Sequence, residues 1–90
     1  MNTDATSVYI KHEPYLKDLV GCPQKACVLE VGHCGISTLN GAPSCLEEVP
    51  ILYENENLPF EEKLSYDALV MKDSIVYLED GHYRIKRKGA

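Results

Sequence analysis

Aromatic residues are scarce in this sequence, which has no Trp, one Phe and six Tyr among 90 residues. It also has no apolar run near the roughly 18 residues that a membrane span needs. Its start, MNTDATSVYIKHEP, lacks the charged and apolar regions of a secretory signal. We therefore expect a cytoplasmic protein, in which the four cysteines are free thiols or metal ligands and not disulfides.

Sequence motifs of catalysis are also missing. The chain contains no G-x-S-x-G, no H-E-x-x-H and no Gly-rich phosphate loop. A thiol nucleophile would need a base beside it. The pair closest in sequence, His33 and Cys34, is adjacent, and neighbours on an extended chain point to opposite sides. We therefore predict no enzymatic activity and no cofactor, with zinc as the one exception.

The composition that is present is that of a folded domain. Hydrophobic residues make up 44% and charged residues 26% of the chain, which argues against wholesale disorder. Residues 1–6 are small and polar, and we predict that they are disordered. Residues 7–90 are predicted to form a single domain with one modest core.

Hydrophobic periodicity predicts alternating strands and helices. Residues 66–71 also allow a strand, but we favour a helix that continues to about Leu69. No internal repeat is evident. The predicted fold class is α+β, with a small mixed or antiparallel sheet of about five short strands and two short helices on one side of it. The predicted strands are 7–12, 25–31, 49–53 and the two of a terminal hairpin, and the predicted helices are 14–20 and 59–69.

The hairpin at residues 74–88 is the clearest local signal. Asp80-Gly81 favours a two-residue turn of type I′, in which both residues have positive φ. That turn fixes the pairing of the two strands, and both strands then assign their apolar residues to the same face. We predict the pairs Glu79–His82, Leu78–Tyr83, Tyr77–Arg84 and Val76–Ile85, with Val76, Leu78, Tyr83 and Ile85 facing inward.

One cluster of residues has the chemistry of a zinc site, because thiolates and imidazole are ligands that zinc prefers. Its spacing, C-x4-C-x5-H-C-x10-C, lacks the C-x2-C turn that presents two ligands together. Ordinary core or loop cysteines are the competing interpretation, and oxidation to disulfides is a third. The zinc-stabilised module is therefore an alternative function, with Cys22, Cys27, Cys34 and Cys45 as ligands beside His33.

Charge is divided unevenly along the chain. Residues 1–81 hold 5 basic and 14 acidic residues (net −9), and residues 82–90 hold 4 basic residues, which together give the net charge of −5. We predict a small protein-interaction or regulatory module that binds a partner protein, with a basic protein as one candidate, through an acidic face or an edge strand. A homodimer through the last strand is one form of this prediction. The acidic face consists of Glu47, Glu48, Glu54, Glu56, Glu61 and Glu62.

The basic end of the chain suggests a second alternative, an accessory nucleic-acid binder. The segment SIVYLEDGHYRIKRKG resembles the wing of a winged-helix domain, which would follow a basic recognition helix. The preceding stretch carries Pro50, an acidic run and only Lys63 and Lys72, so that helix is absent. The net negative charge also opposes phosphate binding. The basic residues, which would equally guard an edge strand against aggregation, are Arg84, Lys86, Arg87 and Lys88.

Overall fold

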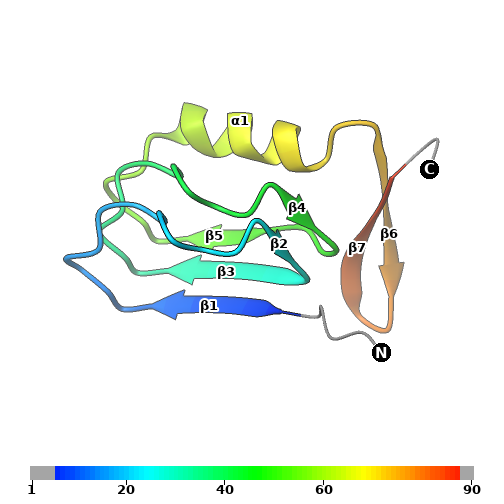
Figure 1. The fold of residues 1–90 in the computed structure, drawn as a ribbon, viewed down its shortest axis with the longest axis horizontal. Helices are drawn as coiled ribbons and strands as arrows, with labels where there is room; N and C mark the ends of the chain where they lie inside the picture. Colours follow the sequence, from blue (N-terminus) through cyan, green and yellow to red (C-terminus); the bar gives the residue numbers. More distant parts are fainter. Residues whose placement is uncertain (1–5, 88–90) are drawn as a thin grey trace.

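The computed structural model describes residues 6–87 of the chain. These residues form a small α+β domain with one helix and several short strands (Figure 1). The fold class is therefore as predicted, although the structure has one helix where two were expected and more strands than expected. The elements are β1 (Ser7–Lys11), β2 (Lys25–Ala26), β3 (Val28–Gly32), β4 (Cys45–Leu46), β5 (Ile51–Tyr53), α1 (Phe60–Val70), β6 (Ser74–Glu79) and β7 (His82–Arg87).

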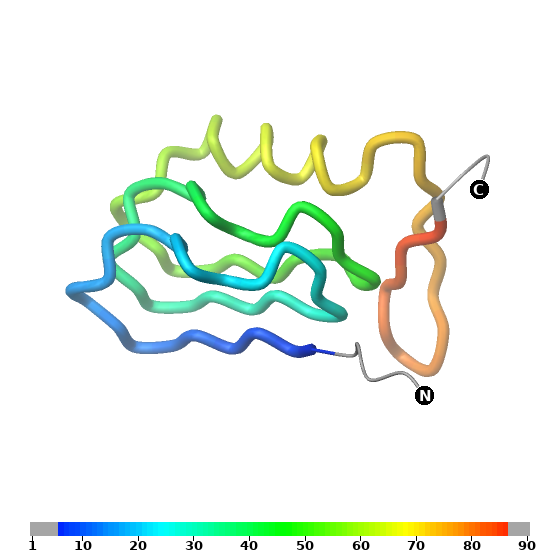
Figure 2. The backbone as a smooth tube through the Cα atoms, in the orientation of Figure 1, coloured from blue at the N-terminus to red at the C-terminus, as the bar shows by residue number. Residues whose placement is uncertain are grey.

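The two sheets before α1 are parallel, and their register reveals a repeat. Strands β1, β3 and β5 lie side by side, with Ser7 opposite Val28 and Glu30 opposite Ile51, so the same offset in sequence separates both pairs of strands. Strands β2 and β4 pair with almost the same offset. The chain thus winds through stacked coils of similar length, as the backbone trace in Figure 2 shows. The predicted alternation of strands and helices is therefore wrong before α1, and the structural repeat was not evident in the sequence.

The helix predicted at residues 14–20 does not form. This stretch is the return segment of the first coil, and its backbone bonds to the second coil instead of to itself. Leu19 N donates to Asn40 O at 3.0 Å, and Ser37 N donates to Lys17 O at 3.1 Å. A two-turn helix is marginal without tertiary packing, so these bonds between coils determine its conformation. Residues 45–46 likewise bond to the preceding coil, where they form β4 in parallel with β2.

The core lies between the sheet of β1, β3 and β5 and the return segments. The predicted second helix is confirmed as α1, which ends the competing strand interpretation of residues 66–71. Two apolar residues of α1 do not face this core, since Phe60 is 69% and Leu64 is 50% exposed. The helix instead buries Tyr66 and Val70. The largest fully buried side chains are Leu19, Leu29, Ile36, Val31, Val70 and Pro43.

The terminal hairpin has the predicted register. Glu79 pairs with His82, and φ is +52° at Asp80 and +81° at Gly81, as a type I′ turn requires. Its predicted inward face is mostly wrong, because Ile85 packs against the core whereas Val76, Leu78 and Tyr83 are 44%, 61% and 62% exposed.

Nor is β7 the edge strand that was expected. Residues 47–49 bond along it, with Val49 N donating to Tyr83 O at 3.0 Å and Ile85 N donating to Glu47 O at 2.8 Å. The hairpin therefore attaches to the turn between the second and third coils, across the beginnings of the parallel strands (Figure 1).

The predicted disordered segment, residues 1–6, falls outside the described residues except for Thr6, whose carbonyl accepts a hydrogen bond from Cys27 N at 2.6 Å. Over residues 6–87, the structure has no helix long and apolar enough to cross a membrane.

Candidate functional site

The outer face of the parallel sheet carries an ordered set of exposed side chains. Alternation along each strand turns Val8, Ile10 and their counterparts toward the core and the intervening residues outward. The register places Tyr9, Glu30 and Ile51 in one row across the three strands. Tyr9 is 60% and Ile51 is 46% exposed, so the row presents apolar surface on a rigid support.

The next row of this face contains Lys11, Gly32 and Tyr53. A methyl group at Gly32 would overlap the Tyr53 ring, so glycine here lets the ring lie across β3. Lys11 Nζ lies 2.8 Å from Glu30 Oε2. This hydrogen bond and the charge of Glu30 raise the pKa of Lys11. Contacts within the face itself therefore connect the two rows.

Two stacked histidines lie at this face, at the ends of the strands. The rings of His12 and His33 are parallel with centroids 4.8 Å apart, and the Tyr53 ring meets His33 edge-on at 5.3 Å. His12, His33 and Glu54 occupy the same place in successive coils, and all three have positive φ, between 51° and 57°. The repeat thus uses one unusual backbone conformation to turn the chain and to stack these side chains.

Beneath the histidines, a side-chain ladder joins the coils. Asn55 Nδ2 donates to Val31 O at 3.1 Å, and Asn55 Oδ1 accepts from Cys34 N at 3.0 Å. The buried thiol of Cys34 lies 3.2 Å from Gly32 O. A shallow pocket of about 290 Å³ opens beside the ladder, lined by Pro14, His33, Cys34, Gly35, Glu54, Glu56 and Asn57.

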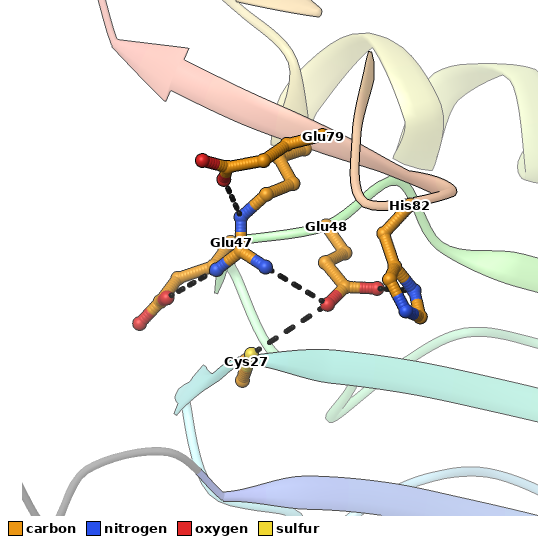
Figure 3. A network of polar contacts seen from close by, with 6 residues as sticks. Cys27, Glu47, Glu48, Glu79 and His82 are labelled. Atoms are coloured by element: carbon orange, nitrogen blue, oxygen red, sulfur yellow. Dashed lines mark hydrogen bonds and ion pairs between the residues drawn. The ribbon is translucent and has the colours of Figure 1, made fainter. Parts of the chain in front are cut away.

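A separate polar network joins the hairpin to the coils (Figure 3). The Arg84 guanidinium reaches three carboxylates, at 3.4 Å from Glu47, 3.5 Å from Glu48 and 3.5 Å from Glu79. The other oxygen of Glu48 lies 3.5 Å from His82 Nδ1. The thiol of Cys27 lies 4.0 Å from Glu48, and burial together with the charges of Glu47 and Glu48 raises its pKa. This arrangement favours the protonated thiol over the thiolate.

The predicted zinc ligands are placed apart. Cys34 is buried in the ladder, Cys27 lies in the Arg84 network, and Cys45 is exposed in β4. Burial raises the pKa of Cys22, which packs against the core. From Thr6 to Arg87, no group of three or more His, Cys, Asp or Glu residues has an arrangement that could hold a metal ion.

The six glutamates predicted as an acidic face are divided among several places. Glu47 and Glu48 pair with Arg84, and Glu54 and Glu56 line the pocket beside His33. On α1, Glu61 is exposed, whereas Glu62 accepts hydrogen bonds from Thr38 Oγ1 at 2.5 Å and Leu39 N at 2.6 Å. These two bonds lower the pKa of Glu62. The structure therefore uses part of the acidic segment for internal contacts.

The basic end is only partly available to a partner. Arg84 is engaged as described, Lys86 is exposed on β7, and Arg87 ends that strand. Lys88 lies outside the described residues.

The sequence prediction missed the outer face because it missed the repeat. The signal was present as alternating apolar pairs that recur one coil later, at Val8 and Ile10 and again at Leu29 and Val31. It is weak in the third coil, where Pro50 and Leu52 take these places. Comparisons with protein-family models, with curated proteins and with solved structures find no match for this chain.

Proposed function

We propose that this chain is a protein-interaction module without catalytic activity, and that it binds its partner on the outer face of the sheet of β1, β3 and β5. The observation that carries this proposal is the row of exposed residues in register, Tyr9 and Ile51 on either side of Glu30, next to Tyr53 and the stacked histidines. Aromatic residues on rigid elements are typical anchors of protein interfaces, since burying them gains much area at little entropic cost.

The repeat supports the same conclusion. The residues Leu29, Val31, Cys34 and Ile36 have the L-x-L-x-x-C-x-L spacing of leucine-rich repeats, whose coils of about 20–29 residues stack with their strands in parallel. Solenoids of this kind offer their sheet as an extended binding surface. The likeness in sequence covers one coil, and the parallel register extends it to the neighbouring coils.

The hairpin enlarges this surface. Its turn borders the third coil across a pocket of about 180 Å³, lined by Ile51, Gly81, His82 and Tyr83 among others. Tyr83 is 62% exposed. A partner on the outer face would therefore reach apolar side chains of both the sheet and the hairpin.

Photo-crosslinking in extract of the source cells tests this proposal. The photoreactive residue p-benzoylphenylalanine would replace Tyr9 on the outer face, and in a control variant Tyr15, which is 89% exposed and lies on the return segment of the first coil. We expect a discrete adduct from position 9 that is reduced by Ile51→Ser, and none of the same mass from position 15. Equal adducts from both positions, or none from position 9, would contradict the proposal.

A further inference from the structure

In the part of the chain that the structure describes, β6 pairs with β7 on one edge and with no strand on the other, and its composition is unusual for an edge strand. The segment Ser74–Glu79 reads SIVYLE, and Ile75, Val76, Tyr77 and Leu78 are each 40–61% exposed. Its other side pairs with β7, whose own outer side is covered by residues 47–49. An exposed apolar edge strand is a template for pairing with another chain.

The geometry of the turn determines which backbone N–H and C=O groups of β6 point toward this edge. In a two-residue hairpin, the residues that flank the turn, here Glu79 and His82, exchange both hydrogen bonds, and every second pair does the same. The groups of Tyr83 and Ile85 consequently point away from β6, and residues 47–49 do bond to them. By the same alternation, the N–H and C=O groups of Val76 and Leu78 point to the free edge. Along this edge of β6, the described backbone hydrogen bonds outside the strand ladders involve only Ser74. Its N–H group donates to Met71 O at 3.2 Å.

We propose that a second copy of this chain pairs with β6 in antiparallel fashion, about a two-fold axis at Tyr77. In this register Val76 and Leu78 of each copy bond to Leu78 and Val76 of the other. Antiparallel pairing about such an axis keeps equivalent faces together. The two hairpins then form one continuous antiparallel sheet.

Charge complementarity favours this occupant over an unrelated strand. The two-fold register puts Glu79 of one copy opposite Ile75 of the other, and Ile75 is paired on its far side with Lys86. Glu79 and Lys86 therefore approach over Ile75 at both ends of the interface, and Tyr77 meets its own copy at the centre. No two like charges are opposed between Ser74 and Glu79. One short strand from each copy buries less area than the roughly 1,200–2,000 Å² that gives stable complexes, so the dimer is weak.

Analytical ultracentrifugation of the full chain over a wide concentration range tests the dimer. We expect reversible dimerisation, and a dissociation constant raised by about tenfold or more in Leu78→Lys, because a lysine guards the edge. The control is Leu69→Lys, which changes a leucine of similar exposure, 56% against 61%, on α1. A wild-type chain that stays monomeric at every concentration, or equal effects of the two substitutions, overturns the proposal.

Disulfide trapping tests the register independently of affinity. At the two-fold axis, Cβ atoms of the two residues 77 lie about 5 Å apart, within reach of a disulfide. The two residues 75 are separated by about 13 Å along the strands. Under mild oxidation we expect Tyr77→Cys to form a covalent dimer beyond the level given by the native thiols of the wild-type chain, and Ile75→Cys not to do so. Equal trapping at both positions, or none at Tyr77→Cys, overturns the pairing.

Discussion

Single buried polar groups connect the helix to the coils, and Tyr66 is the clearest case. Its side chain is 6% exposed, and its hydroxyl donates to Pro43 O at 2.6 Å. Burial, with a smaller contribution from Asp67, strongly raises the pKa of Tyr66. Tyr66→Phe leaves the Pro43 carbonyl unpaired, and we expect the free energy of unfolding at neutral pH to fall by about 1–2 kcal/mol.

The same residue predicts a pH dependence. In the unfolded chain Tyr66 loses its proton near its ordinary pKa of about 10, whereas in the folded chain the hydroxyl stays protonated at that pH. The unfolded state then binds fewer protons, so stability falls as pH rises above about 10. Urea denaturation between pH 8 and pH 11 measures this slope. We expect the slope to be shallower in Tyr66→Phe, and identical slopes would show that Tyr66 does not cause it.

Glu62 provides a second link, with the opposite pH dependence. Its hydrogen bonds from Thr38 and Leu39 favour the ionised carboxylate and lower its pKa. The stabilisation is present above the ordinary pKa of about 4.5 and is lost as pH falls through the lowered value. Glu62→Gln should reduce stability by about 1 kcal/mol at pH 7, since a charged acceptor becomes neutral.

Glu61→Gln is the matched control for that substitution, because Glu61 lies in the same helical turn and is exposed. Thermal unfolding at pH 7 and at pH 3 compares the two variants. We expect the difference between them to shrink at the lower pH. A loss of stability in Glu61→Gln as large as that in Glu62→Gln would contradict the role given to the two hydrogen bonds.

At the scale of elements, sequence reasoning succeeded where the cause is local. The Asp80-Gly81 turn fixes the hairpin register, and Pro59 with two acids in the first turn marks the start of α1. The prediction of a helix at residues 14–20 failed. The apolar residues there have helical spacing, but the backbone bonds to the next coil instead. A methyl group at Gly35 would overlap the carbonyl of Pro14, so the two coils approach closely there. Contacts of this kind depend on the stacking of distant segments, which composition and periodicity do not reveal.

The candidate site was also predicted only in part from the sequence. Sequence reasoning identified Glu47, Glu48 and Arg84 as charged residues for a partner, whereas the structure pairs them with one another. Opposite charges so far apart in sequence carry no sign that they meet. The exposed row of Tyr9 and Ile51 was missed because it exists only through the parallel register.

The Arg84 network predicts how the hairpin is attached. Arg84→Gln removes the charge that three carboxylates share, so we expect residues 47–49 to separate more often from β7. Amide hydrogen exchange at Val49 and Ile85 should speed up by roughly tenfold, while exchange in α1 and β3 stays unchanged. Lys86→Gln, an exposed cation on the same strand, is the control. Equal acceleration in both variants, or acceleration throughout the molecule, would contradict a local role for Arg84.

At the scale of the whole molecule, stability arises from the stacking of similar coils. In a solenoid, each coil packs against its neighbours through the same strand pairing and the same apolar positions. The free energy of unfolding is therefore approximately a sum of contributions from the coils and from the interfaces between them. The constant offset between neighbouring strands makes Val28 and Val49 equivalent positions. A duplicate of residues 28–48 inserted after Glu48 would therefore enter at a junction that the chain already uses.

We expect this lengthened chain to fold with one more parallel strand and to have a thermal midpoint at or above that of the parent. The original α1 and hairpin would then contact the copied Thr38 and Pro43 and the copied Glu47 and Glu48. Far-ultraviolet circular dichroism and differential scanning calorimetry measure the result. A control insert with the same residues in scrambled order keeps length and composition but destroys the apolar positions, and it should unfold at a lower temperature. If the duplicate and the scrambled insert unfold alike, the coils are not interchangeable units, because only the ordered insert can continue the register between β3 and β5.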